Sequence, residues 1–278
     1  MASLDTYTWR ISDGWNNGAP FQVGWRSDHV DVYSHPLSTN QLRLTLDNIP
    51  CVSNATLCSN QTYAAGEYSS VDLLPFGSVT FTAQAAKASG VITGFFLYTG
   101  PSDGQPHDEI DIEFLGNNTT RVQLNYYVNG VGGHEILLPL GFDASLATHQ
   151  YTMAWTDTGI DWYVDGALLH HVSGNAQTLP SHTMRIFSNI WATTGVNAWA
   201  GAFAYLGVPI YAYVDRIDYD SWANIPAAVN NNAAVETSGG GCMTPAIPPW
   251  FIWVFGAAVL LLSWRKQQPA CATTTGFK

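Results

Sequence analysis

Short runs in which apolar and polar residues alternate fill the chain from about residue 6 to residue 222, and Gly, Pro, Asn or Asp separate them. Alternation with a period of two places one side of a β-strand in a core and the other toward solvent. Val, Ile, Tyr, Phe, Trp and Thr, which favour strands, are frequent in the runs. Clear strands are predicted at residues 42–46, 79–83, 91–98, 109–115, 122–128, 150–155, 160–164, 184–189 and 211–219.

Turn residues add a hairpin to this pattern. An Asp-Thr-Gly sequence at 157–159 lies between two alternating runs, and Asp-Gly at 165–166 follows the second run, as expected for tight β-turns. No convincing amphipathic helix and no internal repeat interrupts the runs. The pattern therefore predicts one all-β sandwich domain over residues 1–222.

The C-terminal part has a different composition. Residues 223–246 are mostly small and polar, and such a segment is expected to be a flexible linker because it buries too little apolar surface to become ordered. Residues 247–264 are uncharged and apolar, which predicts a transmembrane helix, and Arg265 and Lys266 place the tail 265–278 in the cytosol. A removable glycolipid-anchor signal is the alternative, because small residues precede the apolar run. A buried core helix is a third interpretation.

Charged residues are scarce in this chain. Lys, Arg, Asp and Glu make up 11% of 278 residues, the formal net charge is −11, and no basic cluster is longer than two residues. Nucleic acids and other polyanions are bound through clustered Lys and Arg, so they are not expected as partners. Trp, Tyr and Phe reach 13%, often beside Asn or Gly, and such groups can bind sugar rings. The composition favours a neutral partner.

Four cysteines are too few to cross-link a chain of this length throughout, and their spacing matches no zinc site. Cys51 and Cys58 bracket a short loop that suits a local disulfide in an oxidising compartment, and two unpaired thiols are the alternative. Cys242 and Cys271 flank the apolar run and are not expected to pair.

Four candidate glycosylation sequences lie in polar, turn-like contexts, at Asn54, Asn60, Asn117 and Asn118. They indicate an extracellular domain at the cell surface. The N-terminal segment has no charged stretch followed by an apolar one, so no signal peptide is visible.

The predicted strand at 109–115 carries three carboxylates on one face. Glu109, Asp111 and Glu113 are two residues apart, so they point to the same side while the residues between them enter the core. A half-exposed strand with an acidic outer face is the simpler interpretation. Like charges about 7 Å apart repel each other, however, and so few charges elsewhere argue against clustering for solubility.

Crowded carboxyls suit the cleavage of glycosides, because one can keep a proton near neutral pH and give it to the leaving oxygen. Retaining enzymes place the two carboxyls about 5–5.5 Å apart. Cα atoms four residues apart on a flat strand are about 13 Å apart. The hypothesis therefore requires a concave sheet that tilts Glu109 and Glu113 toward each other, with Asp111 between them.

The sequence around this strand resembles glycoside hydrolase family 16, and within it the bacterial lichenases, which are endo-β-1,3-1,4-glucanases. The resemblance covers residues 7–222 and rests on LYTGPSDG at 97–104, DEIDIEFLG at 108–116, NNTTRVQLNYYVNGVGGHE at 117–135, LGFDAS at 140–145, WYVDG at 162–166 and PIYAYVD at 209–215. It implies a jelly-roll sandwich of two curved antiparallel sheets with the acidic strand on the concave face.

By the same resemblance, Glu109 is the nucleophile, Asp111 the assisting carboxylate and Glu113 the acid/base. The implied substrate contacts are Asn17, Glu67, Tyr98, Asn125, Tyr127, Asn189, Trp191 and Trp199. No cofactor is implied for catalysis. Asp215 matches the side-chain ligand of a structural calcium ion.

Three features depart from the lichenase pattern. His107 stands where lichenases usually carry Trp, and where xyloglucan transglycosylases of the same family carry His. Ser69 replaces an Arg that binds sugar hydroxyls. Val23 and Ala65 occupy the positions of the lichenase disulfide. These differences bear on the fine specificity.

The leading hypothesis is endo-hydrolysis of β-1,3-1,4-glucan or a related neutral β-glucan by a monomer, through a glycosyl-Glu109 intermediate that water activated at Glu113 releases. The alternative is a membrane-tethered cell-wall transglycosylase, which passes the same intermediate to another glucan chain; His107 favours it. A non-catalytic glucan-binding lectin is a third hypothesis, although a lectin has no need of three crowded carboxyls.

Overall fold

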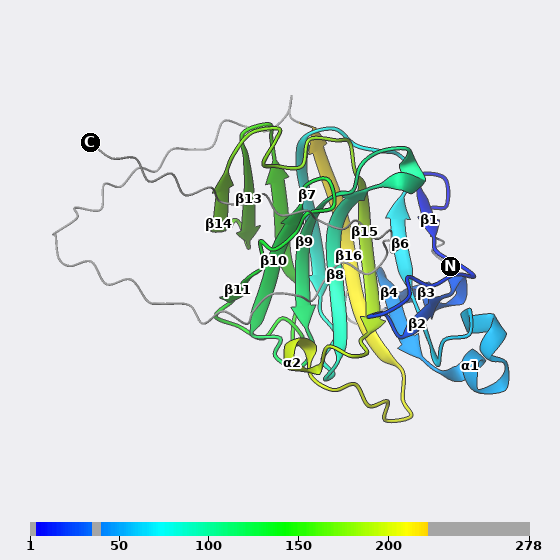
Figure 1. The fold of residues 1–278 in the computed structure, drawn as a ribbon. Helices are drawn as coiled ribbons and strands as arrows, with labels where there is room; N and C mark the ends of the chain where they lie inside the picture. The colour runs from blue at the N-terminus through cyan, green and yellow to red at the C-terminus, as the bar shows by residue number, and fades with distance from the viewer. Residues whose placement is uncertain (1–3, 35–39, 222–278) are drawn as a thin grey trace, which may run out of the picture.

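The computed structural model describes residues 4–34 and 40–221, which fold into two β-sheets packed face to face (Figure 1). Within these ranges one sheet has seven strands, and the other has eight in sequence with a ninth paired to its side. Neighbouring strands are antiparallel, except that β2 and β5 run parallel. The predicted all-β sandwich is confirmed, and the arrangement is consistent with a jelly roll.

The seven-stranded sheet contains the strand with the three carboxylates. Its order is β1 (Trp9–Ile11), β6 (Glu67–Ser70), β15 (Arg185–Ala192), β8 (Val91–Thr99), β9 (Asp108–Leu115), β10 (Arg121–Tyr127) and β11 (Ile136–Pro139).

The nine-stranded sheet covers the other side of the core. Its order is β14 (Ala167–Ser173), β13 (Gly159–Val164), β12 (His149–Trp155), β7 (Gly77–Gln84), β16 (Ile210–Ser221), β4 (Asn40–Asp47), β5 (Tyr63–Ala65) and β2 (Val23–Trp25), with β3 (Val30–Ser34) paired to β4. Two short α-helices, α1 (Ile49–Ser53) and α2 (Asn197–Ala200), and three 3₁₀ turns, at Ser27–His29, Ala55–Cys58 and Pro101–Asp103, complete the described part. Each of the nine predicted strands is present, with ends displaced by a few residues.

The core between the sheets explains why β9 presents its acids outward. Ile110, Ile112 and Phe114 are buried on the inner face of β9. The ring of Phe114 packs on Tyr151 of the opposite sheet, with ring centroids 4.8 Å apart. Burying each such side chain stabilises the fold by about 1.5–3 kcal/mol. A one-residue slip of β9 would expose all three and bury the acids, so its register is strongly favoured.

A disulfide joins Cys51 to Cys58 in the segment between β4 and β5. The loop it closes packs against the N-terminal part of the chain. Arg26 Nη1 donates to the carbonyl oxygen of Leu57 at 3.0 Å, and Asn16 Nδ2 donates to that of Ser59 at 3.1 Å. The cross-linked loop therefore supports the segment that leads to β2.

Replacing Cys51 and Cys58 together by Ser is expected to lower the free energy of unfolding by about 2 kcal/mol, because the closed loop is short. Thermal unfolding with and without a reducing agent checks this. The wild type should lose stability on reduction, whereas the double variant should not respond. Equal responses of the two proteins would contradict the expectation.

The chain beyond β16 lies outside the described residues, and with it the predicted linker, membrane span and tail. Within the described ranges, no helix has both the length and the apolar character needed to cross a membrane.

Candidate active site

β9 lies between β8 and β10 in the seven-stranded sheet, and its outward face carries Glu109, Asp111 and Glu113. Each acid has a residue on either side in register, so three rows run across the sheet. The pairs that flank the acids are Tyr98 and Tyr127 beside Glu109, Phe96 and Asn125 beside Asp111, and Gly94 and Gln123 beside Glu113. The three carboxyls thus share one surface with aromatic and amide groups.

The surroundings of two of the acids favour their protonated forms. The pKa of Glu113 is raised to about 8, first by burial and then by the charge of Glu109, although a hydrogen bond from Gln123 Nε2 (2.9 Å) acts in the opposite direction. Burial, the charges of Glu109 and Glu113 and a hydrogen bond to Glu109 raise the pKa of Asp111 well above its usual range. Glu113 is therefore protonated at neutral pH and can act as an acid.

His107 lies at the start of the same face and contacts Glu109. Its Nε2 is 2.6 Å from Glu109 Oε2, and its ring stacks on Tyr127, with centroids 4.9 Å apart. The sequence pattern singled out this residue only as a departure from the lichenases. Its even spacing from Glu109 along the strand was the signal that places it in the site.

Asp108 anchors the beginning of β9 from the inner side. It is fully buried and accepts hydrogen bonds from the backbone N–H groups of Asn129, Ser181 and His182 and from Nδ1 of His182, at 2.7–3.2 Å. Burial alone would raise the pKa of Asp108, but these bonds outweigh it and lower the pKa. An ionised Asp108 therefore ties two loops to the strand that carries the acids.

Glu67 and Asn189, two predicted substrate contacts, are brought together although 122 residues separate them. Asn189 Nδ2 donates to Glu67 Oε2 at 3.0 Å, and Ser12 Oγ donates to Glu67 Oε1 at 2.6 Å. Gly94 leaves the space that the Asn189 side chain fills, because a Cβ there would come within 2.7 Å of Asn189 Oδ1. Burial raises the pKa of Glu67, and the two hydrogen bonds counteract it.

Trp199 is linked to Glu113 by hydrogen bonds through Gln123, a residue that was not predicted. Its Nε1 donates to Gln123 Oε1 at 2.7 Å, and Gln123 in turn donates to Glu113. Trp191 lies 6.1 Å from Trp199 between ring centroids. It is only 4% exposed and stacks on Phe21 at 3.9 Å, so most of its ring is used in packing.

The remaining predicted contacts differ in how near they lie to the acids. Tyr98, Asn125 and Tyr127 flank β9 directly. Asn125 is 3% exposed and its Oδ1 has no hydrogen-bond partner within the described structure. Asn17 is exposed and accepts a hydrogen bond from Trp25 Nε1 at 2.6 Å. The ring of Trp25 contacts Phe21, and Phe21 stacks on Trp191. Asn17 is therefore linked to Trp191 through these two rings.

Ser69, which replaces the lichenase Arg, has an Arg beside it from another strand. Arg10 of β1 lies opposite Ser69 in register, and Arg10 Nε donates to Ser69 Oγ at 3.0 Å. Arg10 therefore brings a guanidinium group beside Ser69, the position at which the lichenase pattern has an Arg. Sequence spacing could not reveal it, because β1 and β6 are far apart in the chain.

Comparisons with known proteins identify the family of this chain. Residues 17–208 match the profile of glycosyl hydrolases family 16. The β-glucanase of Paenibacillus polymyxa is 40% identical over 221 residues, covering 80% of this chain and 86% of that protein. The β-glucanase of Bacillus subtilis (strain 168) is 41% identical over 212 residues, covering 76% and 80%.

Solved structures give the same result. The β-glucanase of Bacillus licheniformis superposes with a TM-score of 0.69 at 37% identity, covering 78% of this chain and 94% of that chain. A lichenase from a mouse hindgut metagenome gives 0.68 at 37% identity, with the same coverage of both chains. The matched region includes the strand with the three carboxyls. The chain therefore belongs to glycosyl hydrolases family 16 and is a glycosidase.

Proposed function

We propose that this protein is an endo-acting, retaining hydrolase of β-1,3-1,4-glucan or a related neutral β-glucan. The observation that carries the proposal is the outward row on β9, in which Glu113, with its pKa raised to about 8, lies two positions beyond Asp111 and four beyond Glu109. The names of the relatives, β-glucanase and lichenase, support this substrate class.

The residues divide the reaction between them. The Glu109 carboxylate attacks the anomeric carbon, and Glu113 gives its proton to the departing glycosidic oxygen. Glu113, now ionised, takes a proton from a water molecule, which releases the sugar from Glu109. Asp111, whose pKa is raised well above its usual range, shares a hydrogen bond with Glu109, which holds the nucleophile between attack and release.

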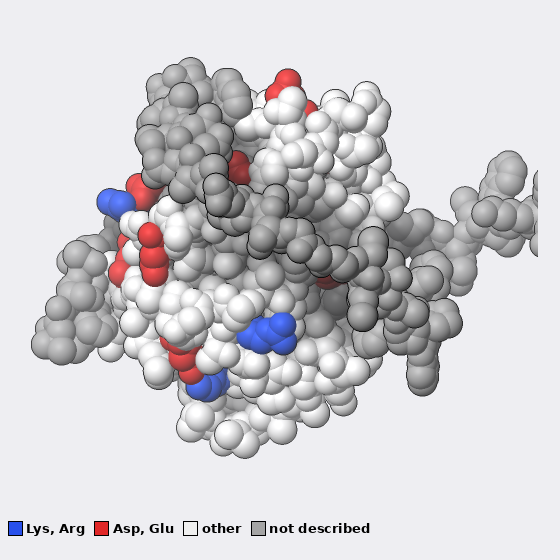
Figure 2. Space-filling view, turned by 90° about the vertical axis from the view of Figure 1, so that its left-hand side faces the viewer, with Lys and Arg blue, Asp and Glu red and all other residues white. Residues whose placement is uncertain are grey.

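A neutral chain of sugars suits the surface around this machinery. Tyr98, Tyr127 and Trp199 offer aromatic groups, and Asn125 and Asn189 each keep a buried amide oxygen without a hydrogen-bond partner in the described structure, a state that buried polar groups seldom keep. Lys, Arg, Asp and Glu are also few on the described surface of the sandwich edge that faces the viewer in Figure 2.

Incubation with mixed-linkage glucan and labelled oligosaccharide acceptors tests the function. Short unlabelled oligosaccharides that appear early from within long chains support endo-hydrolysis. Label that enters long chains would instead identify a wall-remodelling transglycosylase. No change in any β-glucan would leave the lectin hypothesis.

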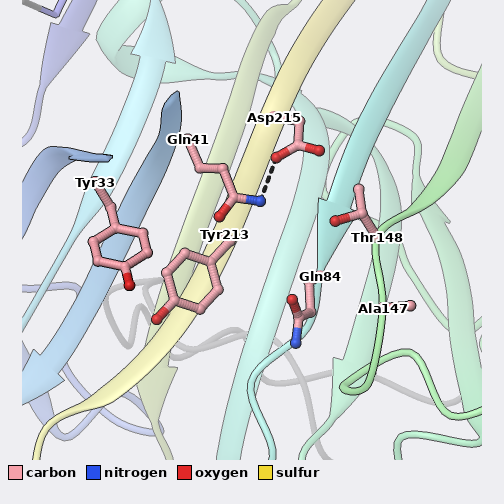
Figure 3. A pocket seen from close by; sticks show the side chains of 7 residues that line it. All are labelled: Tyr33, Gln41, Gln84, Ala147, Thr148, Tyr213 and Asp215. Carbon is pink, nitrogen blue, oxygen red and sulfur yellow. Dashed lines mark hydrogen bonds between the residues drawn. The ribbon is translucent and has the colours of Figure 1, made fainter. Parts of the chain in front are cut away.

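Asp215 supports the proposal of a structural calcium site. It lies at a bulge of β16 and lines a cavity of about 410 Å³, together with Tyr33, Gln41, Gln84, Ala147, Thr148 and Tyr213 (Figure 3). Gln41 donates a hydrogen bond to it. Carboxylate, carboxamide and hydroxyl oxygens are the hard donors that Ca²⁺ prefers, so the lining fits. Asp215 would hold the ion, which would tie β16 to β4.

Adding calcium is expected to raise the thermal unfolding midpoint by several degrees, because an ion at about 100 times its dissociation constant stabilises by about 2.7 kcal/mol. Asp215→Asn should abolish the response. Asp220→Asn, which changes an exposed Asp of the same strand, is the control and should respond as the wild type does. A calcium response that survives in Asp215→Asn would place the ion elsewhere.

The cell surface is the proposed location. Asn54, Asn60, Asn117 and Asn118 are all exposed, as glycan acceptors must be, and the disulfide suits an oxidising compartment. A single C-terminal span would hold the catalytic domain outside the cell as a monomer. A mass decrease on enzymatic deglycosylation of the protein from its native membranes would support this location.

A further inference from the structure

His107 contacts Glu109, the proposed nucleophile, and has no role in the proposed mechanism described above. Its Nε2 lies 2.6 Å from Glu109 Oε2, which is a hydrogen-bonding distance. The two side chains are partly exposed, at 31% for His107 and 19% for Glu109, so both border the surface where the sugar would lie. The proposed mechanism uses Glu109 as an ionised nucleophile, and an ionised carboxylate only accepts hydrogen bonds, so Nε2 would carry the proton of this bond.

The imidazole ring is held on both sides. Tyr127 stacks on it at 4.9 Å with planes 18° apart, and Tyr98 lies 5.1 Å away at a tilt of 56°. Both tyrosines are the register partners of Glu109. The ring and the nucleophile are therefore fixed by the same two neighbouring strands.

The backbone of His107 is fixed as well. Its carbonyl oxygen accepts a hydrogen bond from Gly130 N at 2.7 Å. Gly130 has a φ of 79°, in the left-handed region that glycine adopts readily. Asp108, which directly follows His107, is the buried residue that anchors the beginning of β9. A side chain held this firmly loses little entropy on bonding to Glu109, which favours a lasting contact.

We propose that His107 is a positioning residue for the nucleophile: its Nε2–H group donates to Glu109 Oε2 and holds the carboxylate in the orientation from which it attacks the anomeric carbon. This inference rests on the proposed role of Glu109. Removing the N–H group should slow the attack itself. Keeping the ring should preserve sugar binding, because the stacked surface beside Tyr127 is unchanged.

The test isolates the attack with a 2-deoxy-2-fluoro β-glucan oligosaccharide that carries dinitrophenolate, a leaving group that departs without a proton from Glu113. The rate of dinitrophenolate release and the mass of the glycosylated protein are measured. We expect His107→Phe, which keeps a ring, to slow glycosylation about 10- to 100-fold at unchanged apparent affinity. His107→Gln, which keeps an N–H donor, should recover much of the rate.

His171→Phe is the matched control, because His171 also contacts a carboxylate, Asp161, at 2.6 Å but lies on β14 of the other sheet. It should glycosylate as the wild type does. If His107→Phe reacts as fast as the wild type, or if both His107 variants lose affinity rather than rate, the inference is wrong. A wild type that forms no adduct would instead contradict the proposed function.

A second measurement does not depend on a folded His107 variant. In the nuclear magnetic resonance spectrum of the wild type, the Nε2–H proton of His107 should give a downfield resonance typical of an imidazole bonded to a carboxylate. Glu109→Ala should remove it, and Asp220→Ala, at an exposed carboxyl on β16 of the other sheet, should not. A wild-type spectrum without this resonance would overturn the inference.

Discussion

Replacing Glu109 by Gln is expected to reduce the turnover of β-glucan by about 10³-fold or more while the protein remains folded. The amide has the shape of the carboxyl and can still accept a hydrogen bond from His107, but it cannot attack the anomeric carbon. Glu109 is partly exposed and lies outside the core, so the fold should tolerate the change. Initial rates on mixed-linkage glucan and the thermal unfolding midpoint check the two statements.

Asp220→Asn is the control for this variant. It likewise replaces an exposed carboxyl by its amide, on β16 of the other sheet. It should retain nearly the full rate, which excludes a general effect of removing one negative charge. Near-normal turnover of Glu109→Gln would remove Glu109 from the role of nucleophile and favour another carboxyl of the row.

β9 could be predicted from sequence because its information is local. The two-residue spacing of Glu109, Asp111 and Glu113 and the apolar residues between them fix which side of the strand each occupies. The structure places Ile110, Ile112 and Phe114 in the core, as the alternation requires. Local alternation is also why all nine predicted strands are present.

Contacts between distant segments could not be predicted in the same way. The bond between Glu67 and Asn189 crosses 122 residues, and the approach of Arg10 to Ser69 crosses 59. Both depend on β15, β6 and β1 lying side by side, an order that alternation does not encode. The short strands β1, β5 and β6 also carry too few residues for a period to be recognised.

The division of labour among the acids followed from the family resemblance and not from their spacing. Equal spacing makes Glu109 and Glu113 look alike. Only the structure shows that Gln123 bonds to Glu113 while His107 bonds to Glu109, and that burial weighs on Glu113. These neighbours come from β10 and from the residue before β9, and they set which carboxyl keeps a proton.

The activity on glucan should have an upper pH limit, because Glu113 must carry a proton to act as the acid. The pKa of Glu113 is raised to about 8, so the acid form is present below that pH and is lost above it. Hydrolysis of glucan by the wild type should therefore fall about tenfold for each pH unit above about 8. Rates at low substrate concentration, measured from pH 5 to 10, give the pH profile of kcat/KM. The descending limb of this profile reports the pKa of Glu113 in the free enzyme.

Glu113→Gln should remove both the activity and the limb. Turnover of natural glucan is expected to fall by about 10³-fold, within the range for loss of a general acid. A dinitrophenyl glycoside, which needs no proton, should still react with Glu109 at an appreciable rate, and that rate should show no limb near pH 8. A limb that persists in Glu113→Gln would assign the titration to another group.

Stability should also fall as pH rises, but over a lower pH range than activity. The folded protein keeps the Glu113 proton up to about pH 8, whereas the unfolded chain releases it near the ordinary glutamate value of about 4.3. Between these pH values the wild type binds more protons folded than unfolded, so its stability falls as pH rises. Glu113→Gln has no proton to lose. Its unfolding midpoint relative to the wild type should therefore increase from pH 5 to pH 8, and a constant difference would mean that Glu113 is not buried as an acid.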